Sequence, residues 1–251
     1  MSPPASSPFP AGTLLRRAWR ELGRACVEVL APATCAACGV HCAGALCAGC
    51  AALLESRGGP ACPRCGEPLL APGSPCLAEH RFLSGIDALV SPWRYRGAGG
   101  AIVRRFKFEG DLAAAALLVH AMLAALRASP HALPRRALVM HVPMHRQRRR
   151  QRGFDQAERL ASSLARELQL RFVGAALRRG RATLSQTDPR VTSRAENVAG
   201  AFVVARPRLL AEATVLLVDD VITSGGTARA CAEALRAAGV RRILLLTGAV
   251  G

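Results

Sequence analysis

Apolar and polar residues follow two different periods along the chain, and the two patterns alternate from residue 86 onward. Short apolar runs typical of buried strands are followed by Ala-rich segments whose apolar positions recur with a helical period. The predicted strands cover 86–95, 137–142, 171–177, 215–218 and 241–247. The predicted helices cover 112–126, 157–169 and 228–238. Strands that alternate with helices in this way are typical of an α/β fold.

The segment 215–227 joins an apolar strand to an unusual polar end, and reads V-L-L-V-D-D-V-I-T-S-G-G-T. Two adjacent acids, Asp219 and Asp220, follow the strand, and a turn rich in glycine and hydroxyl groups precedes the helix. Glycines let the backbone approach an anion closely, and the helix N-terminus adds positive potential. The carboxylates would repel a phosphate, so we expect them to face sugar hydroxyls or a magnesium-bound group. The segment therefore predicts a site for a ribose 5-phosphate.

The residues of this site have separate expected roles. Asp219 and Asp220 would hold the ribose hydroxyls. The 5-phosphate would be bound by Thr223, Ser224, Gly225, Gly226 and Thr227. An ordinary strand–turn–helix junction is the alternative, and it explains the glycine pair but neither the acid pair nor the run of hydroxyls. The pattern G-x-x-x-x-G-K-[ST] is absent from the sequence, which excludes a P-loop.

A Gly-rich start leads into a basic helix over residues 96–110. This segment carries Arg104, Arg105 and Lys107, and Lys107 is the only lysine of the chain. These three cations are candidates for binding a phosphorylated ligand. A solvated helix face is the alternative, because it would have the same composition.

A second basic segment follows the predicted strand 137–142. The strand leads to Pro143 and His145, and a run of five arginines that includes Arg146 and Arg152 precedes the next helix. Open α/β sheets bind ligands at the carboxyl ends of their strands, and guanidinium groups bind phosphate oxygens in pairs. We expect Pro143, His145, Arg146 and Arg152 to hold a pyrophosphate group. A solvated charge run is the alternative reading of the arginines.

Cysteines concentrate in residues 35–76, where three C-x-x-C pairs occur. The pairs are Cys35 with Cys38, Cys47 with Cys50, and Cys62 with Cys65; Cys76 and His80 follow. A C-x-x-C pair places two thiolates on one turn, and a tetrahedral zinc needs two such turns. The first two pairs complete one site. The third pair would be completed by Cys76 and His80, with His41, Cys42 or a vacant second site as alternatives, so we expect one or two structural zinc ions.

Charge and composition restrict the class of partner. The chain of 251 residues has a net charge of +17, which favours polyanions such as nucleic acid or phosphorylated metabolites. Aromatic residues make up only 4%, which counts against a platform for stacking single-stranded bases. No secretory signal is evident, and the longest apolar run, 112–126, is short for a membrane span. We therefore expect a cytoplasmic protein, in which cysteines are metal ligands more often than disulfides.

Two polar regions flank these elements. Residues 1–32 begin as a Ser/Pro-rich tail and continue as a basic amphipathic helix over 14–30. Residues 178–202 lack apolar periodicity, and we expect them to form a mobile flap that closes over a sugar phosphate; an uninvolved loop is the alternative.

The ordered motifs of residues 33–249 resemble the ComF family of competence-associated phosphoribosyltransferase-like proteins. They are the C-x-x-C pairs, Y-R-G…F-K-F-E-G, V-P-M-H…R-R-R-Q-R-G-F-D-Q-A-E-R-L-A, R-A-T…Q…R…N-V-A-G-A-F and V-L-L-V-D-D-V-I-T-S-G-G-T. The last motif also resembles the phosphoribosyl pyrophosphate (PRPP) loop of type I phosphoribosyltransferases. Two positions depart from the usual family pattern: Asp155 replaces an asparagine, and Ser224 replaces a threonine.

This resemblance implies a parallel sheet flanked by helices over 86–251, preceded by a double zinc ribbon over 33–82. It implies PRPP with Mg²⁺ as ligand and a role in DNA uptake, with single-stranded DNA and the competence machinery as partners. Two functions are open: a phosphoribosyltransferase or PRPP binder, and a nucleic-acid-binding accessory protein without transfer activity. A PRPP-sensing regulator is a third, less favoured because no helix-turn-helix pattern occurs in the sequence.

Overall fold

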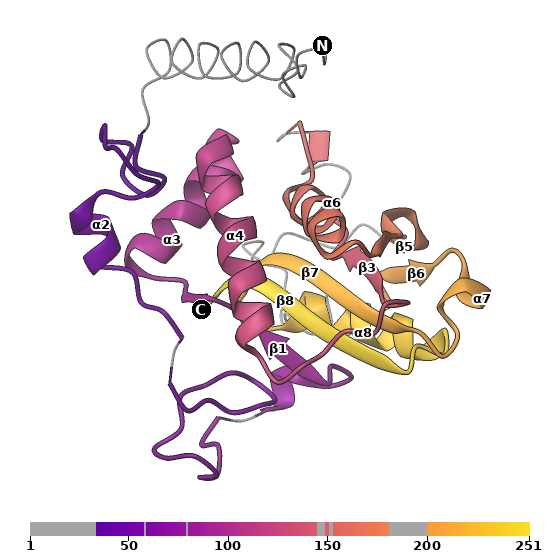
Figure 1. Ribbon diagram of the computed structural model, residues 1–251. Helices are drawn as coiled ribbons and strands as arrows, with labels where there is room; N and C mark the ends of the chain where they lie inside the picture. The colour runs from indigo at the N-terminus through magenta and orange to yellow at the C-terminus, as the bar shows by residue number, and fades with distance from the viewer. Residues whose placement is uncertain (1–33, 58, 79, 145–148, 151–152, 181–199) are drawn as a thin grey trace, which may run out of the picture.

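The computed structural model describes residues 34–57, 59–78, 80–144, 149–150, 153–180 and 200–251, and a β-sheet forms its centre (Figure 1). The strands lie in the order β1-β8-β7-β3-β4, and β2 pairs with β8 beyond the end of β1. Every pairing in this sheet is parallel. The strands are β1 Ala88–Val90, β2 Trp93–Arg94, β3 Leu138–His141, β4 Arg171–Phe172, β7 Thr214–Ile222 and β8 Arg242–Val250. The predicted α/β fold with a parallel sheet is confirmed.

Helices cover both faces of the sheet (Figure 1). Helices α3 (Gly97–Arg104), α4 (Leu112–Ala128) and α6 (Gln156–Leu168) pack on one face, and α8 (Gly226–Ala237) packs on the other. Successive side chains of a strand point to opposite faces. In β7, Leu216 and Val218 accordingly join the core under α3, α4 and α6, whereas Val215 and Leu217 join the core under α8. The bare apolar runs of the sequence are strands buried on both sides.

The two central strands run further than the sequence pattern predicts. β7 continues to Ile222 and β8 to Val250, with Asp219 opposite Thr247 and Val221 opposite Ala249. The two acids therefore lie inside the strand rather than after it. The apolar pattern stops at the acids, but the backbone ladder continues because β8 supplies partners along its whole length.

A short antiparallel hairpin brackets the segment predicted to be a flap. β5 (Leu177–Arg179), which follows the 3-10 turn η3 (Gly174–Ala176), pairs with β6 (Phe202–Val204), and the short helix α7 (Pro207–Leu210) comes next. Residues 181–199 lie outside the described part of the chain, as does the predicted basic helix 14–30. The flap therefore remains a prediction.

The two cysteine-rich segments pack on opposite faces of the sheet. Cys35, in the segment that contains helix α2 (Ala48–Ala52), is buried in the core under α3, α4 and α6. Cys62 and Cys65 are buried in the core under α8, and the 3-10 helix η1 (His80–Leu83) follows them. Both segments thus share a core with the sheet domain, and the boundary predicted near residues 82–86 remains a prediction.

Glycines at the start of α3 allow close packing rather than phosphate contact. A Cβ added at Gly99 would lie 2.7 Å from the carbonyl oxygen of Arg94, and one at Gly97 would lie 2.7 Å from that of Leu53. α3 can therefore lie directly on β2 and on the first cysteine segment. Beyond Arg104 the helix widens into a π-helical turn, η2 (Arg105–Glu109), which Gly110 ends in a left-handed conformation.

Among the residues that the structure describes, no helix has both the length and the apolar content needed to cross a lipid bilayer.

Candidate functional site

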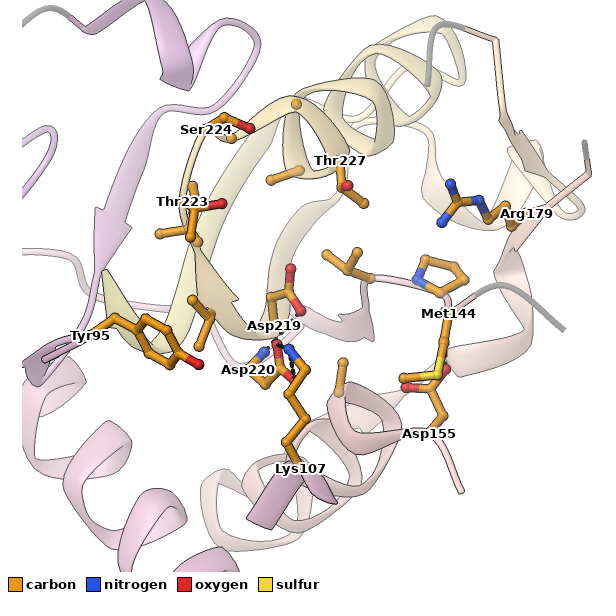
Figure 2. A pocket seen from close by; sticks show the side chains of 18 residues that line it. Tyr95, Lys107, Met144, Asp155, Arg179, Asp219, Asp220, Thr223, Ser224 and Thr227 are labelled. Carbon is orange, nitrogen blue, oxygen red and sulfur yellow. Dashed lines mark hydrogen bonds and ion pairs between the residues drawn. The ribbon is translucent and has the colours of Figure 1, made fainter. Parts of the chain in front are cut away.

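A cavity of about 300 Å³ opens at the carboxyl ends of β3 and β7 (Figure 2). Its walls come from six regions of the chain: the end of β7 with the turn before α8, the residues after β3, the start of α6, the π-helical turn η2, the hairpin β5–β6 and the residue after β2. The labelled lining residues are Tyr95, Lys107, Met144, Asp155, Arg179, Asp219, Asp220, Thr223, Ser224 and Thr227. The volume lies at the lower end of the range of about 300–1,000 Å³ that is typical of small-molecule sites.

Asp219 lines this cavity as a partly buried acid. Figure 2 shows its carboxyl group on the side of the turn that carries Thr227. The backbone N–H of Asp220 donates to Asp219 Oδ1 at 2.9 Å. Burial raises the pKa of Asp219 well above its ordinary value, and the negative charge of Asp220 raises it further. Asp219 therefore keeps its proton to a higher pH than an ordinary aspartate, and a carboxyl group that holds its proton can both donate to and accept from a sugar hydroxyl.

Asp220 is paired with the only lysine of the chain. Lys107 Nζ lies 3.0 Å from Asp220 Oδ2 and donates to Oδ1 at 3.2 Å. The Asp220 side chain is 9% exposed and that of Lys107 23% exposed, so the pair is largely shielded from solvent. Lys107 is one of the three cations predicted as candidates for binding a phosphorylated ligand, and the structure places it at the cavity wall with a carboxylate as its partner. Its contact with a ligand remains a prediction.

The turn between β7 and α8 presents backbone and hydroxyl groups to the cavity. All five residues predicted to bind the 5-phosphate line it: Thr223, Ser224, Gly225, Gly226 and Thr227. Gly225 precedes α8 with φ 71°, and an added Cβ would lie 2.6 Å from the carbonyl oxygen of Phe82. Only glycine fits this position. The first N–H groups of α8 point toward the turn, so the turn combines free donors with the positive end of the helix.

The residues after β3 form the opposite wall. Pro143 and Met144 line the cavity, whereas His145, Arg146 and Arg152 lie outside the described residues, so their predicted contact with pyrophosphate stays untested. Asp155 is 5% exposed and begins α6. Its Oδ1 accepts from the Glu158 N–H at 3.1 Å, and its Oδ2 accepts from the Met144 N–H at 3.0 Å. Asp155 thereby ties the wall to the helix, a role that uses both of its acceptor oxygens.

Three lining residues with polar side chains were missing from the predicted site: Tyr95, Asp155 and Arg179. Tyr95 follows β2, and its N–H donates to the Val250 carbonyl oxygen at 2.6 Å, so β8 places it at this edge. The guanidinium of Arg179 lies 5.4 Å from the centre of the Phe202 ring across the hairpin. A sequence signal existed for Asp155, which departs from the family pattern beside the arginine run. Tyr95 and Arg179 gave no signal because strand pairing alone brings them to the cavity.

The cysteines form two compact groups of potential metal ligands. The atoms of Cys35, Cys38, Cys47 and Cys50 lie within 4.8 Å of one another, and so do those of Cys62, Cys65, Cys76 and His80. The distances are 3.8 Å between Cys38 Sγ and Cys47 Sγ, 3.6 Å between Cys65 Sγ and Cys76 Sγ, and 3.5 Å between Cys62 Sγ and His80 Nε2. Tetrahedral zinc with its usual bond lengths requires about 3.8 Å between two sulfurs and about 3.5 Å between sulfur and nitrogen. Both groups fit zinc.

The fourth ligand of the second group was left open by the sequence. The structure brings His80 to this group, while Cys42 instead donates to the carbonyl oxygen of Gly44 at 3.0 Å. His41 belongs to neither group among the described residues. The spacing of Cys76 and His80 along the chain was therefore the better guide.

Comparison with known proteins agrees with this geometry. The profile of the phosphoribosyl transferase domain matches residues 151–247, which include the turn and both acids. The chain is 30% identical to Competence protein F of Haemophilus influenzae over 216 residues, which are 81% of this chain and 93% of that protein. This chain belongs to the ComF family.

Other members of the family carry a different name. The ComF-family chain is 31% identical over 194 residues to the DNA utilization protein YhgH of Salmonella typhimurium, covering 76% of this chain and 83% of that protein. It is 30% identical over 178 residues to the protein of that name from Escherichia coli K12, covering 69% of this chain and 77% of that protein. The predicted ComF family is therefore confirmed.

We expect the two acids to have opposite effects on the stability of this ComF-family protein. Folded Asp219 keeps its proton to a higher pH than in the unfolded chain, where its pKa is about 3.9, so stability falls as pH rises above that value. Asp219→Asn should therefore be more stable than wild type at pH 7 and similar to it below about pH 4. Asp220→Asn should be less stable at pH 7 by about 1–3 kcal/mol, because Lys107 loses its partner. Unfolding with guanidinium at both pH values measures these differences in stability. An equal loss of stability for Asp219→Asn at pH 7 and at pH 4 would contradict the raised pKa of Asp219.

Proposed function

We propose that this protein binds the ribose 5-phosphate part of PRPP as its magnesium complex, in the manner of a phosphoribosyltransferase. The single observation that carries the proposal is that the Asp219 carboxyl group and the glycine-rich turn face one cavity. The turn offers donors for a phosphate, and the acid offers a partner for hydroxyls a short distance away. The phosphoribosyl transferase domain match over residues 151–247 supports the same ligand class.

The charges around the cavity favour a ligand that brings a cation with it. Within the described part of the chain, three carboxyl groups line the cavity, those of Asp155, Asp219 and Asp220, against the two cations Lys107 and Arg179. Magnesium prefers phosphate oxygens and water and is commonly bound together with its substrate. The proposed ligand would then place its phosphate at the turn, its diol at Asp219 and Asp220, and its pyrophosphate beside Pro143. His145, Arg146 and Arg152 would complete the pyrophosphate contacts.

Transfer from PRPP would form a bond between the anomeric carbon and an acceptor nucleophile and break the bond between that carbon and pyrophosphate, which would leave. The transition state has oxocarbenium character, so positive charge develops on the sugar ring. The negative charge of Asp220, and that of Asp219 once it is ionised, would stabilise this positive charge, while the turn and Pro143 would hold the two ends of the ligand in place. The chain would thus contribute positioning and electrostatic stabilisation.

Calorimetric titration with PRPP and Mg²⁺ tests the proposal. We expect wild-type protein to bind, and Asp219→Asn and Asp220→Asn to bind about tenfold or more weakly, because hydrogen bonds to charged groups contribute roughly 1.5–3 kcal/mol. Glu233→Gln is the matched control, since it removes an exposed acid of α8 outside the cavity. Absence of binding by wild type, or equal binding by all four proteins, would overturn the proposal.

We further propose that both cysteine groups hold structural zinc. All four positions of each are filled by protein ligands, which leaves no open position for chemistry. In the first group burial opposes ionisation of Cys35, but N–H donors including those of Cys38 and Cys47 outweigh it and lower its pKa to about 6. Hydrogen bonding with Cys47 and Cys38 raises the pKa of Cys50 to about 12. Four thiolates therefore form together only when a cation neutralises them.

Metal analysis of the purified protein should give two zinc ions per chain. Because the thiols must lose protons to bind, zinc affinity should fall as the pH is lowered, and proton release should accompany zinc uptake. A competition titration with a chromophoric chelator at several pH values measures both. Retention of one zinc ion in Cys76→Ser would assign the lost ion to the second group, and zinc affinity independent of pH would contradict thiolate ligation.

A second candidate function is binding of single-stranded DNA, alone or together with PRPP. The net charge of +17 favours it, and relatives bear the names Competence protein F and DNA utilization protein. We infer a role in DNA uptake and in handling the incoming strand, with the competence machinery as partner. The sequence favours a cytoplasmic location for this role.

Binding of a labelled single strand should weaken steeply with salt. The logarithm of the association constant is expected to fall with the logarithm of salt concentration by about 0.7 for each phosphate neutralised. Fluorescence anisotropy across a salt series measures this slope, and added PRPP with Mg²⁺ shows whether the strand occupies the cavity. An interaction that is absent or insensitive to salt near 0.1 M would exclude this function.

A further inference from the structure

In both cysteine groups, the first C-x-x-C pair is followed by a left-handed glycine on which an arginine side chain packs. Gly39 follows Cys38 with φ 77°, and an added Cβ would lie 2.5 Å from Arg105 Nη1. Gly66 follows Cys65 with φ 69°, and an added Cβ would lie 3.5 Å from the Arg57 guanidinium carbon. Each group of thiols therefore has one guanidinium packed on its turn.

The two arginines differ in what else they are attached to. Arg57 lies in the cysteine-rich region itself and bonds to the Cys65 carbonyl oxygen and to Glu67, each at 2.9 Å. Arg105 begins the π-helical turn η2, two residues before Lys107. Single π-helical turns are rare and occur frequently at functional sites. The first cysteine group is thus linked by one side chain to the element that carries the cavity's lysine.

The link between Arg105 and Lys107 is stiff. Arg105 Nε and Nη2 donate to Asp111 Oδ2 at 3.1 and 2.5 Å, and Asp111 Oδ1 accepts from the Ala114 N–H at the start of α4. Phe106, between Arg105 and Lys107, is 0% exposed and shares a core with Cys35. On the other side of the turn, Gln156 Nε2 donates to the Lys107 carbonyl oxygen at 3.1 Å.

We infer that Arg105 is a positioning residue through which the first cysteine group, with its metal, holds Lys107 against Asp220. The inference rests on zinc binding by this group but not on PRPP as the ligand. Four thiolates and one Zn²⁺ carry two net negative charges, which a guanidinium at the turn offsets. Loss of the metal releases the turn at Gly39, so Arg105 loses the surface on which it packs and η2 loosens.

The second cysteine group provides an internal comparison. η1 begins at His80, a member of this group, and the Phe82 carbonyl oxygen packs on Gly225 in the turn between β7 and α8. Loss of the metal from this group should therefore disturb the turn between β7 and α8 while leaving the Lys107–Asp220 pair in place. The two groups support opposite walls of one cavity.

The single lysine makes the inference directly measurable. Reductive methylation with ¹³C-formaldehyde labels only Lys107 and the N-terminal amine, so the zinc-loaded full-length protein gives two distinguishable NMR signals and keeps the lysine charge. Asp220→Asn defines the position of the Lys107 signal when the pair is broken. Arg105→Gln and Cys47→Ser test the link. Arg104→Gln, a change at the neighbouring exposed arginine, and Cys76→Ser, in the second group, are the matched controls.

We expect Arg105→Gln and Cys47→Ser to move the Lys107 signal most of the way toward its position in Asp220→Asn. Arg104→Gln and Cys76→Ser should leave it at the wild-type position. Arg105→Gln should also weaken binding of PRPP with Mg²⁺ about tenfold, in line with the usual effect of outer-shell residues. Because Arg105→Gln keeps all of the metal ligands, its spectrum decides the question even if Cys47→Ser does not fold.

Two outcomes would overturn the inference. The first is a Lys107 signal that Asp220→Asn moves but Arg105→Gln does not. The second is an equal shift in Arg104→Gln, which would show a general charge effect of the helix. If wild type fails to bind PRPP while the Lys107 signal still responds to Arg105→Gln and Cys47→Ser, the proposed ligand is wrong and the link stands.

Discussion

Two adjacent carboxyl groups lie at the polar end of an otherwise apolar sheet, and the fold has to accommodate their charge. Lys107 forms an ion pair with Asp220, whereas burial and the charge of Asp220 let Asp219 keep its proton to a higher pH. The unfavourable burial of Asp219 makes this edge of the sheet suitable for a ligand that brings hydroxyl groups and a divalent cation. The rest of the cavity consists of groups that suit the other end of such a ligand.

The cavity walls depend on parts of the chain that appear unrelated to it in sequence. The first cysteine group contacts η2 through Arg105, and the second contacts the turn between β7 and α8 through Phe82 and Gly225. The cysteine groups lie on opposite faces of the sheet, so each supports a different wall. If the cysteine groups hold zinc as proposed, a metal site without catalytic chemistry would still contribute to the cavity by fixing the elements that form its walls.

Much of the site could be predicted from local sequence. The strand–acid–glycine segment predicted the turn, and its five residues all line the cavity. The C-x-x-C pairs predicted one complete group of metal ligands and half of a second, and the close spacing of Cys76 and His80 pointed to the members that complete the second. These features could be recognised in the sequence because phosphate binding and metal ligation need particular residue types at short spacings along the chain. The resemblance to the ComF family rested on the same short motifs, and comparison with known proteins confirmed it.

The sequence by itself determined the α/β class, the polar turn and the three C-x-x-C pairs, because each depends on neighbours within a few residues. Only the tertiary structure decided that Lys107 would meet Asp220 across 113 positions of the chain, and that Tyr95 and Arg179 would line the same cavity. It also decided that the glycines before Lys107 serve packing on β2 rather than phosphate binding. Such contacts arise from strand order and helix placement in a sheet, so no local pattern of residues encodes them.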